Sequence, residues 1–250
     1  MKRFFITLSY NGKNYCGWQI QPNAISVQQT LQESLSTILR QKIDIVGAGR
    51  TDSGVHARNM IAHFDWGHGY LNTHDLVSKL NRFLPKDIAI KSIKEVVPDA
   101  HARFSAISRV YSYCITLHKD SFLYEYKYRV SFTPDIELMN RFCAILLATN
   151  DFTSFSKLHT DVKTNLCKLK QAQWNKTDEG DYLFTIEADR FLRNMVRSIV
   201  GTLLLGGRGK LDEVGLRQII GAKDRSTAGE SVPAHALFLE QVKYPEDIWM

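Results

Sequence analysis

The sequence lacks the features that mark several classes of protein. It has only four cysteines in 250 residues, and none has CxxC spacing or stands beside a histidine in a ligand pattern, so neither a disulfide framework nor a zinc site is expected. No apolar run reaches the length of a membrane span. The N-terminal residues meet polar side chains too early for a signal peptide. These absences predict a soluble protein of the cytoplasm with reduced thiols.

The composition is that of an ordinary globular protein. Hydrophobic residues make up 44% of the chain and charged residues 23%, which excludes a disordered or fibrous protein. The length suits one large domain or two small ones. Lys and Arg number 32 against 26 Asp and Glu, a formal net charge of +6. This excess is compatible with a polyanionic partner such as nucleic acid but does not require one.

Periodic patterns predict short strands and helices that alternate along the whole chain. In the first part, strands are expected over 3–10, 42–49, 55–66 and 87–97, and helices over 26–41 and 74–85. In the second part, strands are expected over 109–118, 126–132, 168–176, 181–189 and 235–244, and helices over 135–150, 190–207 and 211–221. This alternation predicts an α+β or α/β architecture in two lobes.

Three local signals refine this outline. Ser26 with Gln29 predicts a capping box at the first helix. The non-periodic stretch 98–108 predicts a boundary between lobes spanning 1–100 and 101–250. On the expected helix 190–207, the spacing of Arg190, Arg193 and Arg197 permits one basic stripe. The neighbouring apolar face would carry Phe191, Met195 and Ile199.

The stretch GAGRTDSGVHA (47–57) concentrates glycines around charged residues. It is not a dinucleotide loop, because Asp52 stands where the third glycine of GxGxxG belongs and would repel a pyrophosphate. It also lacks the Gly-Lys-Ser/Thr of a P-loop, and GGRGK (206–210) fails the same test at Leu211. Nucleotide-dependent chemistry is therefore not expected.

Two interpretations of this loop remain open from the residues alone. Asp-Ser-Gly is ordinary turn chemistry, since aspartate accepts local backbone hydrogen bonds and glycine supplies positive φ. Alternatively, a carboxylate between small residues is accessible to a bulky substrate, and Arg50 can keep Asp52 ionised or bind a phosphate. An ionised, accessible aspartate can act as a covalent nucleophile.

The same stretch resembles the active-site signature of the TruA family of tRNA pseudouridine synthases. Further segments resemble that family in the same order along the chain: HARFSAISRVYSYCI (101–115), NDFTSF (150–155), MVRSIVGTLL (195–204), AKDR (222–225) and AHALFL (234–239). The resemblance implies an α+β fold with two RNA-recognition-motif-like lobes, mostly antiparallel sheets and a central cleft. Ser53, Ala236 and Phe238 stand where alanine, glycine and tyrosine are more common in the family.

The resemblance also implies roles for particular residues. Asp52 would be the nucleophile, Arg50 would extrude the target uridine and take its place in the stack, and Tyr111 would stack on the flipped uracil. Arg197 would pair with Asp52. Contacts to the uracil pocket or to tRNA would come from Leu237, His101, Arg103, Phe104 and Lys163. His56 would be structural, and the loop glycines would clear space for the base.

The implied reaction is isomerisation of uridine to pseudouridine at tRNA positions 38, 39 and 40, in the anticodon arm. It needs no cofactor, metal or group donor, because atoms are only rearranged. The implied partners are tRNA and a second copy of the chain in a homodimer. A non-catalytic RNA-binding protein or tRNA folding chaperone would share the charge and fold, but it would have no need of Asp52.

Overall fold

The computed structural model describes residues 1–157 and 164–250, and their contacts divide the chain into two compact units. The first unit comprises residues 1–108 and 238–250, and the second comprises residues 109–237. The C-terminal residues therefore group with the N-terminal part of the chain, whereas the sequence pattern alone assigns them to a lobe spanning 101–250. Both units combine helices with strands in a mixed α+β architecture, which confirms the expected fold class.

The first unit is built on a mostly antiparallel sheet. Its elements are β1 (Lys2–Tyr10), β2 (Val46–Gly47), β3 (His56–Trp66), β4 (Ile88–Val96), β9 (Leu237–Lys243), α1 (Val27–Leu39) and α2 (Thr73–Phe83). The strand order is β4-β1-β3-β9, with β2 on β3. Strand β1 is antiparallel to both of its neighbours, and β9 joins β3 in parallel through two residue pairs.

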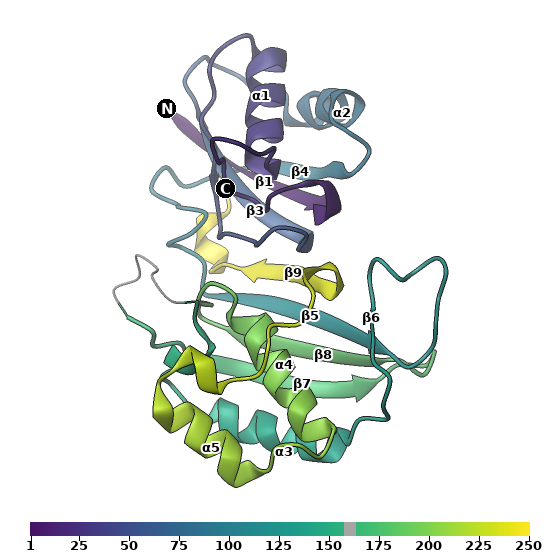
Figure 1. Ribbon diagram of the computed structural model, residues 1–250. Helices are drawn as coiled ribbons and strands as arrows, with labels where there is room; N and C mark the ends of the chain where they lie inside the picture. The colour runs from purple at the N-terminus through teal and green to yellow at the C-terminus, as the bar shows by residue number, and fades with distance from the viewer. Residues whose placement is uncertain (158–163) are drawn as a thin grey trace. The chain divides into compact units, whose positions relative to one another are not determined.

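The two helices of this unit contact each other, and α2 packs against β4 (Figure 1). Leu31 and Leu35 of α1 and Leu76 and Leu80 of α2 are buried. The apolar spacing in the sequence therefore marks the faces that build this core.

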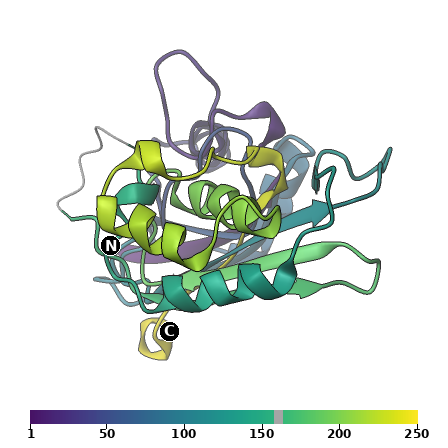
Figure 2. The ribbon, with the colours of Figure 1, turned by 60° about the horizontal axis from the view of Figure 1, so that its bottom comes forward.

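The second unit places three helices beside a small antiparallel sheet. Its elements are β5 (Ser108–Thr116), β6 (Tyr128–Arg129), β7 (Leu169–Lys176), β8 (Tyr182–Ala188), α3 (Ile136–Leu147), α4 (Met195–Gly207) and α5 (Glu213–Ala222). The order β5-β8-β7 is antiparallel throughout, and β6 adds a short parallel pair to β5. Helix α3 contacts β7, α4 and α5, and the three helices form a layer over the strands (Figure 2).

Most expected elements are present, including the β7–β8 hairpin, but three details are wrong. The capping box at Ser26 is only half formed: Ser26 Oγ accepts from Gln29 N at 3.2 Å, while the Gln29 side chain donates to Glu33. The strand expected over 126–132 shrinks to Tyr128–Arg129. Val130 still donates to Thr116 O, and residues 131–132 then continue toward α3 outside any strand.

The third correction concerns the start of α4, which begins at Met195 rather than at residue 190. Asn194 adopts a left-handed conformation with φ 65°, which an α-helix cannot continue through. Asp189 holds the preceding chain instead, since its Oδ1 accepts from Lys168 N and Arg190 N. Arg190 and Arg193 are therefore not on the helix, and the expected basic stripe with Arg197 does not form.

Two further properties concern the whole described chain. Its four cysteines are free thiols, and burial raises the pKa of Cys143 to about 12. No helix in the described part of the chain is long and apolar enough to cross a membrane.

Candidate active site

The loop that carries Asp52 connects β2 to β3 in the first unit. Residues 52–55 form a turn in which Val55 N donates to Asp52 O at 3.2 Å. Gly54 has a φ of 77°, a conformation that favours glycine over other residues. Arg50 is exposed and Asp52 is half-buried. The turn therefore presents the aspartate on an ordered backbone.

A segment that follows β1 holds this loop from one side. Trp18 N donates to Thr51 O at 3.3 Å, and Tyr10 Oη and Thr51 Oγ1 are 2.9 Å apart. The Tyr15 carbonyl accepts from Ser53 Oγ at 3.3 Å and from Gly54 N at 3.4 Å. We call residues 10–18 the brace. It contacts the backbone on both sides of Asp52.

The brace lies so close to the loop that two of its positions have no room for a side chain. A Cβ on Gly12 would lie 2.0 Å from Val55 O, and one on Gly17 would lie 2.2 Å from Thr51 O. Gly17 also has a φ of 83°. Glycine is therefore required at both positions by close approach of two backbones.

The brace is itself anchored to the rest of the unit through Tyr15. Its hydroxyl donates to Asp87 Oδ1 at 2.7 Å, and burial together with this hydrogen bond raises the pKa of Tyr15. Sequence reasoning missed the brace. The available signal was the pair of glycines that follows β1 directly, in a segment rich in aromatic residues.

Gly47 and Gly49 of the Asp52 loop have different surroundings. A Cβ on Gly47 would lie 2.4 Å from Trp18 Nε1, so an indole ring of this chain fills that space. The expectation that the loop glycines clear room for a base is therefore wrong for Gly47. A Cβ on Gly49 would meet nothing within 4 Å, so there is open space beside that glycine.

His56 lies at the start of β3 and is buried. Its Nδ1 accepts from Gly12 N at 3.1 Å, and its ring stacks on Phe238 with centroids 4.7 Å apart. The Arg58 guanidinium covers the same Phe238 ring at 4.7 Å. These contacts fit the structural role expected for His56, since both the ring face and Nδ1 are occupied within the unit.

A second ordered turn of the first unit carries His101, Arg103 and Phe104. Nδ1 of His101 accepts from Arg103 N at 3.1 Å and Phe104 N at 3.3 Å, and burial, with Arg3 and Arg103 nearby, lowers its pKa. Phe104 is 75% exposed, and the Arg103 guanidinium lies 5.5 Å from its ring centre. The turn thus presents an aromatic ring and a cation to solvent.

His63 supports this turn from beneath. Its Nδ1 accepts from Ala102 N at 3.1 Å, which requires an unprotonated nitrogen. Burial, helped by the charges of Arg3 and His101, lowers the pKa of His63 to about 4.

The second unit contains the remaining described candidates. Tyr111 lies on β5, and its ring meets Phe191 edge-on with centroids 5.2 Å apart. Arg197 lies in the first turns of α4, where its Nε donates to Val232 O at 2.7 Å. Leu237 is buried at the end of the turn Ala234–Ala236. Lys163 lies outside the described residues.

Arg197 also acts on the strand that carries Tyr111. Burial raises the pKa of Tyr113, two residues further along β5, and the positive charge of Arg197 opposes part of that rise. Tyr113 donates to Pro233 O at 3.0 Å, close in sequence to the carbonyl that holds Arg197. The segment 232–233 therefore ties the start of α4 to β5.

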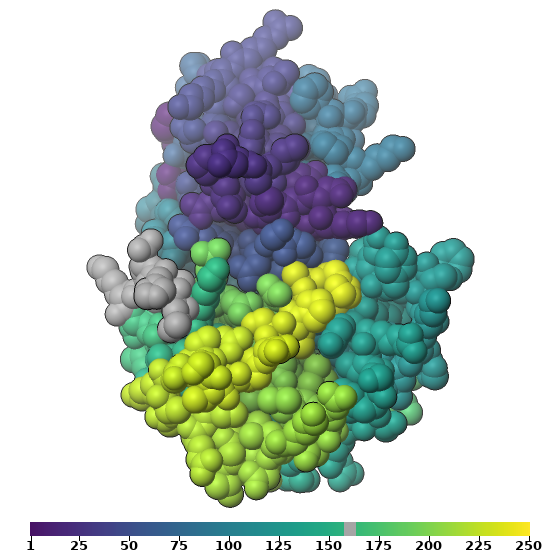
Figure 3. Space-filling view, in the orientation of Figure 1, coloured from purple at the N-terminus to yellow at the C-terminus, as the bar shows by residue number. Residues whose placement is uncertain are grey.

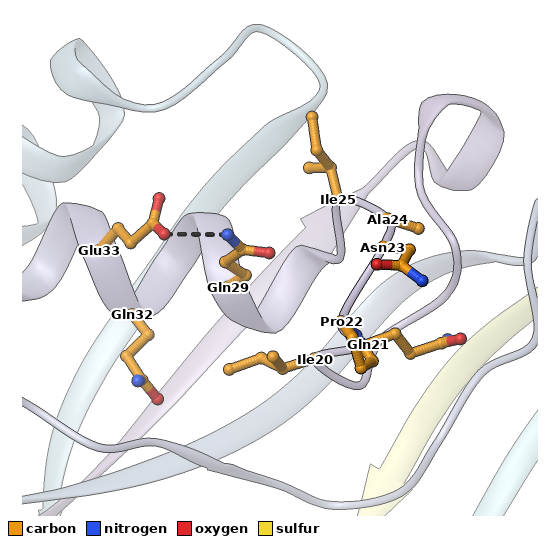
Figure 4. A pocket seen from close by; sticks show the side chains of 9 residues that line it. All are labelled: Ile20, Gln21, Pro22, Asn23, Ala24, Ile25, Gln29, Gln32 and Glu33. Carbon is orange, nitrogen blue, oxygen red and sulfur yellow. Dashed lines mark hydrogen bonds between the residues drawn. The ribbon is translucent and has the colours of Figure 1, made fainter.

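A hollow of about 560 Å³ lies in the first unit between residues 20–25 and α1 (Figure 4). Its three glutamine side chains already have partners within the unit. Gln29 donates to Glu33 at 3.0 Å, Gln32 accepts from Ile45 N and Gln21 donates to Cys16 O. Among the described residues, no group of three or more His, Cys, Asp or Glu side chains could hold a metal ion.

The fold and the Asp52 loop together define an α+β protein with a half-buried carboxylate on a hydrogen-bonded turn. The family model described as "tRNA pseudouridine synthase" matches residues 6–105 and 143–245. The chain belongs to the tRNA pseudouridine synthase family, and it is an isomerase that acts on uridines in tRNA.

Individual relatives support this membership along the full length of the chain. The chain is 58% identical to tRNA pseudouridine synthase A of Parabacteroides distasonis over 250 residues, covering 100% of this chain and 98% of the relative. It is 55% identical to the protein of that name from Bacteroides thetaiotaomicron, covering 100% and 93%. It is 38% identical to that from Clostridium acetobutylicum, covering 98% and 100%.

Proposed function

We propose that the protein isomerises uridine to pseudouridine at positions 38, 39 and 40 of the tRNA anticodon arm, with Asp52 as the nucleophile. The observation that carries this proposal is a half-buried aspartate on an ordered turn, in a chain related to tRNA pseudouridine synthases along its whole length. A carboxylate held by a braced backbone is suited to nucleophilic chemistry, because its position is set before the substrate arrives.

The reaction is balanced within the substrate. The bond between uracil N1 and ribose C1′ breaks, the base rotates, and C5 bonds to the same C1′. The proton that leaves C5 is matched by one gained at N1. Asp52 acts by attack at C1′, by attack at C6, or by assisting loss of the C2′ proton; all three routes need an ionised carboxylate against the nucleoside.

The target uridine must leave its stack, at a cost of a few kcal/mol. Arg50, which is exposed in the Asp52 loop, fills the vacated place, and Tyr111 stacks on the uracil, a contact worth about 1–3 kcal/mol. Arg197 pairs with Asp52 and holds its carboxylate, and Leu237 lines the uracil pocket. The exposed Phe104 supports a further proposed contact to tRNA by the turn that it shares with His101 and Arg103.

Recognition of three neighbouring positions implies that the enzyme reads tRNA shape rather than a sequence motif. Basic surface, including Lys163, supplies contacts to phosphates, so binding weakens with salt. We further propose that the enzyme acts in the cytoplasm as a homodimer.

The test is to incubate the protein with transcribed tRNAs that carry uridine at positions 38 to 40, and to map pseudouridine. The wild type should modify these positions, and Asp52→Asn should abolish product while tRNA binding remains. Asp44→Asn is the matched control, because it makes the same change at an exposed carboxylate of the first unit, whose ion pair with Lys42 spans 4.0 Å. No product from the wild type on any such tRNA overturns the proposed function. Product from Asp52→Asn overturns the nucleophile assignment alone.

A further inference from the structure

The second unit has a hollow of about 380 Å³ outside the candidate active site. It is lined by Arg208, just past the end of α4, and by the stretch Tyr128–Arg129–Val130–Ser131–Phe132. The stretch belongs to the connection between β5 and α3, part of which forms the teal surface of Figure 3. None of these residues has a role in the proposed reaction.

The hollow contains two cations that the described chain does not neutralise. Arg129 and Arg208 are both exposed, and neither forms an ion pair with any described residue. Three other cations of this unit do form ion pairs: Lys127 with Asp181, Arg141 with Glu213 and Lys223 with Asp151. Two unpaired guanidinium groups that line one hollow repel each other, so an anion between them would be favourable.

Neutral donors of the same stretch are also available. Within the described chain, neither the backbone N–H groups of Ser131 and Phe132 nor the Ser131 hydroxyl donates a hydrogen bond. The hollow thus combines guanidinium, amide and hydroxyl donors in a lining that has no carboxylate. Such a donor set suits the oxygen atoms of a phosphate group.

The backbone that carries these donors is fixed before any ligand arrives. Tyr128 and Arg129 pair with β5, and Val130 is buried and donates to Thr116 O at 2.9 Å. The Arg208 guanidinium lies 5.2 Å from the centre of the Phe132 ring. Stacking on an aromatic ring holds a guanidinium plane in place and leaves its N–H edge for a ligand.

We propose that this hollow binds a phosphate group of the tRNA backbone. The proposal rests on tRNA being the substrate, and it adds a contact to that substrate through residues that take no part in the chemistry. Arg129 and Arg208 donate hydrogen bonds to the phosphate oxygens, and the Ser131 hydroxyl and the adjacent amide groups supply the remaining donors. The aromatic rings of Tyr128 and Phe132 close the hollow beside the neighbouring sugar.

The test compares two double variants that lose the same charge. Arg129→Ala with Arg208→Ala empties the hollow of cations, and Lys176→Ala with Arg217→Ala removes two exposed cations elsewhere in the unit. The dissociation constant of a tRNA transcript is measured between 50 and 200 mM salt. One phosphate contact makes binding weaken about threefold more over that range.

Raising the salt from 50 to 200 mM should therefore weaken tRNA binding by the Arg129/Arg208 variant about threefold less than it weakens binding by the wild type. The Lys176/Arg217 variant should keep the wild-type salt dependence. Turnover at saturating tRNA should stay at the wild-type value in both variants. Equal salt dependence in the two variants overturns the phosphate site.

Further measurements identify the source of the phosphate and distinguish failure of this site from failure of the proposed reaction. Arg129/Arg208-dependent binding to phosphatidylglycerol vesicles, with unchanged tRNA binding, overturns the proposal in favour of a lipid headgroup. Effects on inorganic phosphate binding alone, with unchanged tRNA binding, overturn it in favour of a free anion. Wild-type protein that binds tRNA with the expected salt dependence but makes no pseudouridine leaves this site supported and overturns only the proposed function.

Discussion

Gly17→Ala tests whether contact between the brace and the Asp52 loop sets the position of the proposed nucleophile, Asp52. The added Cβ would lie 2.2 Å from Thr51 O, and Thr51 directly precedes Asp52. Side chains do not approach a carbonyl oxygen closer than about 3 Å, so the brace and loop must separate by about 1 Å. The φ of 83° adds strain to any residue with a Cβ.

The expected magnitude follows from these two effects. The left-handed conformation costs alanine about 1–2 kcal/mol, so the free energy of unfolding should fall by at least that amount. A displacement of about 1 Å at a reacting group can cost about 100-fold in rate. We therefore expect the chemical step to slow by about 10- to 100-fold, while tRNA affinity stays near the wild-type value.

The assay is single-turnover pseudouridine formation at saturating tRNA, with urea unfolding measured on the same preparations. Gly221→Ala is the control, because a Cβ at that position on α5 would meet nothing within 4 Å. A Gly17→Ala protein that keeps both the wild-type rate and the wild-type stability would refute the idea that the brace positions Asp52. If the variant is less stable but has the wild-type single-turnover rate at a temperature where it is folded, the role of the brace is only structural.

Two further predictions concern buried groups of the first unit. Tyr10→Phe leaves Thr51 Oγ1 without its 2.9 Å partner, so the free energy of unfolding should fall by about 1–3 kcal/mol, and kcat should fall with KM unchanged. Adding Thr51→Val should recover part of the lost stability. A double variant whose loss equals the sum of the two single losses would contradict the coupling between these residues. His63 is held neutral with a pKa near 4, below the value of about 6.5 for an unfolded histidine. The unfolded chain therefore binds the proton first, and the free energy of unfolding should decline by about 3 kcal/mol as the pH falls from about 6.5 to 4 and then level off. His63→Asn keeps an acceptor for Ala102 N, so urea unfolding across this range should show a flatter pH dependence, and an unchanged slope would assign the effect to other groups.

Local patterns in the sequence predicted much of the fold. The helices with clear apolar spacing and the β7–β8 hairpin lie within a few residues of their expected limits, because their stability depends on periodic burial. The predicted start of α4 was wrong because Phe191, Met195 and Ile199 keep helical spacing across Asn194, whose backbone is left-handed. Spacing alone carries no information about that backbone conformation.

In the candidate site too, local patterns predicted some features and missed others. The stretch 47–57 by itself marked Asp52 and Arg50 as the residues of interest, and its resemblance to a family identified the reaction class. No pattern indicated the Tyr10–Thr51 hydrogen bond or the backbone contact at Gly17, since these join residues far apart in the chain.

The sequence by itself determined the α+β class through local periodicity and the family through its motifs, and it marked the Asp52 carboxylate as the candidate nucleophile. Only the tertiary structure decided which segments hold that carboxylate and that residues 238–250 pack with the first unit. It also decided why Gly47 must be small beside Trp18. The physical reason is that close packing and long-range hydrogen bonds are formed between segments whose proximity exists only after the chain has folded.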